Sequence, residues 1–131
     1  MNNLLPRDKQ DFERVNNLKL TGKKELIALL AGLLEWLQDM NWPISIEVSE
    51  LLVQKTPIET IPFVKNVLNS DDDIWKANCL RYFVMKLPSE LLEIDNLHKD
   101  LIRIATRPTM GEELEEVHLT ALEIIEAHHI R

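Results

Sequence analysis

The chain has 131 residues, of which 45% are apolar and 28% charged, and its formal net charge is −7. This length suits a single domain, residues 1–131, with a core of its own. Three glycines and six prolines argue against disorder and against an all-β fold full of tight turns. The negative charge disfavours nucleic acid and anionic membrane as partners, because phosphate groups repel such a surface. A basic protein is the partner that the charge favours.

The chain has one cysteine, Cys79, so it cannot form an intramolecular disulfide. The first eight residues lack the apolar core of a signal peptide. The longest apolar run, residues 26–34, is about half of the roughly 20 residues that a membrane-spanning helix needs. We therefore expect a cytoplasmic protein.

Apolar residues recur at helical spacing through the first third of the chain. We expect a short helix over residues 8–19, then a long helix over residues 22–38 that is capped by Thr21. The apolar stripe of the long helix is wider than that of a helix with one side exposed to solvent. This width predicts a central position in the domain. The residues expected to be buried in these two helices are Phe12, Val15, Leu18, Leu26, Ile27, Leu30, Leu33, Leu34 and Leu37.

A turn over residues 39–41 precedes Pro43, which is typical of the start of a helix, and we expect that helix over residues 44–55. Thr56-Pro57-Ile58-Glu59 then has the pattern of a capping box with proline at the first helical position, which predicts a helix over residues 57–69. The expected buried positions are Ile44, Val48, Leu51, Leu52, Ile61, Val64, Val67 and Leu68.

The second half of the chain continues in the same way. Three aspartates at 71–73 suit the first turn of a helix over residues 72–87, and a helix over residues 96–106 follows. A second capping box, Thr109-Met110-Gly111-Glu112, predicts a last helix over residues 111–128. On that helix we expect Leu114, Val117, Ala121 and Ile125 to face inward and Glu112, Glu116 and Glu123 to face outward. No window alternates with the period of a strand.

These elements form three helix pairs whose turns lie near residues 41, 71 and 108, a spacing of 30 to 37 residues. Repetition at this period is typical of an α-solenoid. The predicted fold is thus all-α: a small HEAT-like α-α superhelix of about three helix pairs plus a short N-terminal helix. An irregular bundle of six or seven helices is the alternative.

The turns also carry a family resemblance. Leu33-Leu34-Glu35-Trp36-Leu37-Gln38-Asp39-Met40-Asn41-Trp42-Pro43 resembles the signature of the bacterial family known as domain of unknown function 5071. Asp72-Asp73-Ile74-Trp75-Lys76, and Pro108-Thr109 followed by Glu112, Glu115, Glu116 and Val117, are similar to two further motifs of that family. The segment at residues 6–9 is a looser match, because the family usually has a histidine and an aspartate soon after it. The resemblance implies a small all-helical bacterial protein and no particular activity.

If the helix pairs stack in parallel, the three turns lie along one edge and the three motifs form a ridge, which repeat proteins commonly use for binding. The candidate partner-binding residues on this ridge are Asp39, Asn41, Trp42, Asp72, Asp73, Trp75, Lys76, Thr109, Glu112 and Glu116. The alternative is that they are caps and turn residues that build each pair. Among the tryptophans we expect Trp42 to be partly exposed, as a protein-binding hot spot requires.

The sequence therefore favours a non-catalytic protein-interaction module, with an immunity or adaptor role as one example. The alternative is a small-molecule binder or enzyme with a polar pocket near Asp39, Trp42, Asp72 and Lys76. A helical-repeat module for nucleic acid is disfavoured by the charge.

No cofactor, metal site or catalytic residue is predicted. His118 lies about 15 Å along a helix from His128 and His129, too far to share a metal ion. These last two histidines suit the negative end of a helix. Cys79 lies between apolar neighbours, which is typical of a small buried side chain rather than of a nucleophile.

Overall fold

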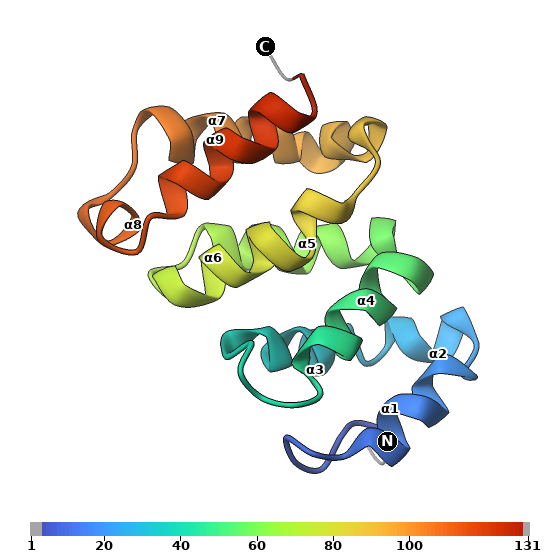
Figure 1. The fold of residues 1–131 in the computed structure, drawn as a ribbon. Coiled ribbons are helices and arrows are strands. Elements are labelled where there is room, and N and C mark those ends of the chain that lie inside the picture. The colour runs from blue at the N-terminus through green and yellow to red at the C-terminus, as the bar shows by residue number, and fades with distance from the viewer. Residues whose placement is uncertain (1–3, 130–131) are drawn as a thin grey trace.

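The computed structural model describes residues 4–129, and within this range the chain is all-α with no strand (Figure 1). The α-helices are α1 (Phe12–Lys19), α2 (Lys23–Ile27), α3 (Leu30–Leu34), α4 (Ser45–Lys55), α5 (Pro57–Leu68), α6 (Asp73–Tyr82), α7 (Leu97–Thr106), α8 (Met110–Leu114) and α9 (Val117–Ala127). Three 3-10 segments join them: η1 (Glu35–Gln38), η2 (Val84–Lys86) and η3 (Ser89–Asn96). None of the helices in residues 4–129 has the length and apolarity to cross a membrane.

The helices stack in chain order, from α1 at one end to α7 and α9 at the other (Figure 1). Successive layers are formed by α3 with α4, α5 with α6, and α7 with α9, and α5 and α6 each also pack on a neighbouring layer. Buried apolar side chains from all the layers form one continuous core. Short turns between the members of a pair thus produce a stack in which each layer contacts the next.

The long helix expected over residues 22–38 is interrupted, and this prediction was wrong. It is divided into α2, α3 and η1, and at the first break the N–H of Leu29 donates to the carbonyl of Leu26, three residues back. The interruption buries Leu29 and leaves Ile27 42% exposed, where the stripe predicted Ile27 in the core. Thr21 is also not the cap: Gly22 holds that position, and the Thr21 hydroxyl donates to the carbonyl of Asn17.

The last predicted helix is also two helices. Glu116 has a left-handed backbone (φ +57°), which separates α8 from α9. Because of this break Leu114 is 76% exposed, where a continuous helix would have buried it, whereas Val117 and Ala121 are buried as expected. A glutamate seldom adopts this conformation, so the sequence carried no signal for the break.

The two predicted capping boxes differ in outcome. The Thr109–Glu112 box is present in full at the start of α8. Thr56 does precede α5, with Pro57 at the first position, but its hydroxyl contacts Thr60 and the carbonyl of Leu52 instead of capping the helix. Phe12, predicted to be buried, is 40% exposed on α1.

Candidate functional site

The three turn motifs lie along one edge of the stack, at the left of Figure 1, where the loop after η1, the α5–α6 turn and α8 follow one another. Side chains of α6 join the first two motifs: the Trp75 indole N–H donates to the Leu34 carbonyl at 3.1 Å, and the Asn78 amide donates to the Leu37 carbonyl at 2.8 Å. On the other side of α6, the Asp73 carboxylate lies directly against the α-carbon of Gly111. Each motif is therefore in contact with the next.

Glu112 is the centre of the contact between the second and third motifs, and its side chain is fully buried. Arg103 of α7 binds its carboxylate with two hydrogen bonds of 2.6 and 2.9 Å, and Lys76 of α6 donates a third at 3.1 Å. The backbone N–H of Thr109 donates a fourth at 2.8 Å. Four donors use the full acceptor capacity of a carboxylate, so one side chain ties α6, α7 and α8 together.

Lys76 is almost as deeply buried as Glu112 and lies between two carboxylates. Its ammonium nitrogen is 2.9 Å from Oδ1 of Asp73 and 3.1 Å from Oε2 of Glu112. The four side chains Asp73, Lys76, Arg103 and Glu112, which we call the ion cluster, have balanced formal charge. Ion pairing with opposite charges is the form in which ionised groups tolerate burial.

The hydrogen bonds determine the ionisation state of Glu112. Burial alone would raise its pKa, but the hydrogen bonds from Arg103, the Thr109 N–H and Lys76 outweigh burial and lower the pKa to about 2. The same contact raises the pKa of Arg103. The Glu112 carboxylate is therefore ionised at neutral pH.

These observations correct part of the predicted ridge. Glu112 was expected to face outward and Lys76 to be available to a partner or a pocket, but their side chains are fully or almost fully buried. Neither reaches solvent in this conformation. Both residues instead contribute to the contacts that hold α6, α7 and α8 together.

Other members of the ridge have roles in the turns. The Asp72 carboxylate accepts the Trp75 backbone N–H at the start of α6, and Asp39 accepts the N–H of Asn41. Thr109 caps α8. The side chains of Asn41, Asp72, Thr109 and Glu116 are exposed, and those of Asp39, Trp42, Asp73 and Trp75 are partly buried.

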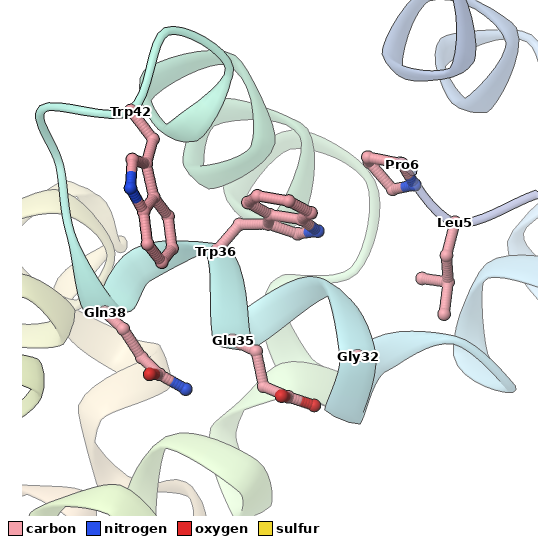
Figure 2. Close-up of a pocket in the computed structure, with 7 residues that line it drawn as sticks. All are labelled: Leu5, Pro6, Gly32, Glu35, Trp36, Gln38 and Trp42. Atoms are coloured by element: carbon pink, nitrogen blue, oxygen red, sulfur yellow. The ribbon is translucent and has the colours of Figure 1, made fainter. Parts of the chain in front are cut away.

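The first motif forms a hollow on the surface beside this edge (Figure 2). The rings of Trp36 and Trp42 meet edge to face, with centroids 5.4 Å apart and planes at 74°, a preferred geometry for aromatic pairs. The buried hydroxyl of Ser45 fixes the turn that carries them, because it lies 2.6 Å from the carbonyl oxygen of Trp36 and 2.9 Å from that of Asp39. Two half-buried indoles are thus held on a rigid turn.

The hollow has a volume of about 310 Å³ and is lined by Leu5, Pro6, Gly32, Glu35, Trp36, Gln38 and Trp42. The N-terminal segment forms the wall beyond Trp36, where Leu5 packs so closely on Gly32 that a β-carbon there would lie 2.9 Å from it. The side chains of Glu35 and Gln38 extend in the same direction from η1 (Figure 2). Glu35 is exposed and has no ion pair with any residue in the described range. The hollow is apolar and aromatic with a carboxylate and an amide at its rim.

A second hollow, of about 520 Å³, lies at the opposite end of the chain between η3 and the end of α9. His98, His128 and His129 line it together with Ser89, Glu90, Leu92 and Glu93. Oγ of Ser89 is 2.7 Å from Nδ1 of His128, which joins the end of α9 to η3. Within residues 4–129, no three His, Cys, Asp or Glu side chains come together in a way that suits a metal ion.

Cys79 is fully buried on α6. Burial in the core, and to a smaller extent the negative charge of Asp72, raise the pKa of its thiol. This thiol is therefore not disposed to act as a nucleophile.

Two features of the edge were not singled out from the sequence. Arg103 binds Glu112, but a half-exposed arginine on an amphipathic helix has no distinguishing pattern. The hollow is lined in part by three residues of the first motif, Glu35, Trp36 and Gln38. The one sequence signal for this lining is the presence of two tryptophans close to the same turn. Of the four residues around which a polar pocket was expected, Asp39, Trp42, Asp72 and Lys76, Trp42 alone lines the hollow described above.

Comparison with family models matches residues 4–125 to the family described as domain of unknown function (DUF5071). Comparison with curated proteins gives no match.

Proposed function

We propose that this chain, which belongs to the DUF5071 family, is a non-catalytic protein-interaction module of the HEAT-like, α-solenoid kind. It acts in the bacterial cytoplasm and binds a basic protein along the edge formed by its turns. The observation that carries the proposal is the alignment of the three motifs: contacts from α6 hold each turn against the next. A continuous surface of this type is what repeat proteins offer to partners.

The exposed charge on this edge is mainly negative. Its exposed carboxylates, which we call the acidic edge, are Asp71, Asp72, Glu113, Glu115 and Glu116. Together with a net charge of −7, they favour a positively charged partner and would accelerate its association. The buried ion cluster supports the proposal indirectly, because it gives the edge a fixed shape.

The enzyme alternative has less support in the geometry. Lys76, the base or cation that such a pocket would need, is held between two carboxylates. The raised thiol pKa of Cys79 and its burial argue against a nucleophile on α6. The site thus offers recognition surfaces rather than positioned reactive groups.

The test uses charge reversal at positions whose side chains form no ion pair or hydrogen bond within residues 4–129. Asp71→Lys/Glu113→Lys changes the acidic edge, while Glu90→Lys/Glu126→Lys changes the net charge equally at η3 and at the end of α9; all four residues are exposed. Immobilised wild type and both variants are used to capture proteins from bacterial lysate. The captured protein is then purified and its affinity for all three is measured by calorimetry, with circular dichroism as the check on folding.

The expected result is a basic protein that binds wild type and the Glu90/Glu126 variant alike, and binds the Asp71/Glu113 variant at least about tenfold more weakly, as loss of complementary charge predicts. Equal binding by all three forms, or no specific binding to any, would contradict the proposal.

A further inference from the structure

The hollow between the N-terminal segment and η1 has a composition that suits one kind of guest. Its walls are apolar and include two indoles, Trp36 and Trp42, and its rim carries the Glu35 carboxylate and the Gln38 amide. Indole is the best of the aromatic side chains for attracting a cation. A guest with a flat cationic head and an aliphatic stem satisfies both the walls and the rim.

We propose that this hollow binds an arginine side chain presented by the partner protein. The proposal rests on the proposed function, since it names the group that the partner inserts beside the acidic edge. A guanidinium stacks on an indole face, and its fork of N–H donors suits a carboxylate with both oxygens available. Its three methylene groups would lie against Leu5 and Pro6, which line the hollow.

Charge complementarity is the reason to choose a cation over an apolar side chain. Glu35 is exposed and has no cationic neighbour within hydrogen-bond distance among residues 4–129, unlike Glu112, Glu59 and Glu47, which pair with Arg103, Lys23 and Lys19. An arginine in the hollow would supply that missing partner through charge-assisted hydrogen bonds, which are stronger than those between neutral groups. Gln38 would accept a further N–H through its carbonyl oxygen.

The size and rigidity of the hollow also fit. A volume of about 310 Å³ is enough for one long side chain and is small for a drug-sized ligand. Ser45 and the edge-to-face contact of the rings hold the indoles in place, so little conformational entropy is lost on binding. Arginine and tryptophan are among the residues most enriched at binding hot spots.

The experiment is an NMR titration of the whole protein with N-acetyl-arginine methylamide. The same titration with the citrulline analogue, which has the same shape without the charge, and with the lysine analogue provides the comparison. The indole N–H signals of the three tryptophans report on the site. Trp75 is the internal reference, because its indole N–H is bonded to the Leu34 carbonyl and it does not line the hollow.

The expected result is that the signals of Trp36 and Trp42 shift with the arginine compound and that Trp75 does not change. Glu35→Gln should weaken this binding by about tenfold, the value of one charge-assisted hydrogen bond. Glu113→Gln, which removes an exposed carboxylate on α8, should have no effect. Trp42→Leu should also weaken binding, and circular dichroism checks that the variant is folded.

Equal shifts with the citrulline compound, or unchanged affinity in Glu35→Gln, would overturn the proposal; stronger binding of the lysine compound would overturn the choice of arginine. Failure here is distinct from failure of the proposed function. If the protein captured from lysate still depends on Asp71 and Glu113 but binds Glu35→Gln and Trp42→Leu as it binds wild type, the acidic edge is the interface and the hollow is not part of it.

Discussion

Lys76 and Glu112 form an ion pair inside the protein, 36 positions apart in the sequence, with 3.1 Å between the ammonium nitrogen and the carboxylate. Both side chains are almost completely shielded from solvent. The pair joins the second and third turn motifs of this chain, so it links the α5–α6 turn to the start of α8. Its role in holding the edge together leads to two predictions about stability.

Replacing Glu112 with glutamine should lower the free energy of unfolding by about 3 kcal/mol, because Lys76 and Arg103 lose a shared anionic partner in a buried site. Denaturant unfolding monitored by circular dichroism measures the change. Glu113→Gln is the matched control: this neighbour on α8 is exposed, and its loss should change stability by less than about 0.5 kcal/mol. Equal stability of the two variants would show that the buried pair contributes nothing net.

The stability of the protein should fall in acid because of the same carboxylate. In the folded protein the pKa of Glu112 is about 2, against an ordinary value of 4.5 that it regains on unfolding. Since the folded-state pKa is the lower one, the contribution is complete above pH 4.5 and is lost as the pH falls towards 2. Urea titrations at intervals between pH 6 and pH 2 measure how steeply the free energy of unfolding changes with pH. The free energy of unfolding of Glu112→Gln should depend less on pH than that of wild type. An equal dependence in the two proteins would assign the acid sensitivity to other groups.

Much of the fold could be predicted from the sequence because the signals for it are local. Apolar spacing located the buried faces of α4 and α5, and Pro57 and the Thr109 capping box located two helix starts. The single-helix predictions failed where tertiary contacts override a periodic pattern. Apolar residues recur at helical spacing over residues 22–38, yet α2 ends at Ile27, α3 begins only at Leu30, and Leu29 between them is buried in the core.

The candidate site was less predictable for a physical reason. Glu112 was expected outside because a glutamate in a first helical turn is usually a solvated cap residue, and it does reach back to the Thr109 N–H as a cap should. Whether such a carboxylate is buried depends on cations from other helices. Arg103 and Lys76 come from α7 and α6, and their convergence follows from packing rather than from spacing. The contact of Asp73 with Gly111 is equally invisible in the sequence.

Gly111 should not tolerate alanine, although alanine normally favours a helix over glycine by about 0.5–1 kcal/mol. A β-carbon at this position would overlap the Asp73 carboxylate, so that Asp73 would have to move from Lys76. Gly111→Ala should therefore lower the free energy of unfolding by about 1–3 kcal/mol, a typical cost of overpacking.

A double-mutant cycle isolates this clash from other effects of the alanine. In the Asp73→Ala background the overlapping carboxylate is absent, so adding Gly111→Ala should cost less than it does in wild type. An equal cost in both backgrounds would show that the Gly111 position is sensitive for a reason other than Asp73.

Cys79 should be unreactive in the folded protein. Its thiol is fully buried, and its pKa is raised mainly by this burial and to a smaller extent by the charge of Asp72. Reagents therefore reach the sulfur poorly, and the population of thiolate is low. At pH 8 the native protein should react with iodoacetamide at least about a hundredfold more slowly than the protein in concentrated urea. Because the chain has a single cysteine, the fraction of protein that gains the mass of one label gives the extent of reaction directly. The rate in urea is the internal control. Rapid labelling without denaturant would instead mean that α6 separates readily from the core. The edge would then not be rigid, and the binding proposals that depend on its rigidity would have to be abandoned.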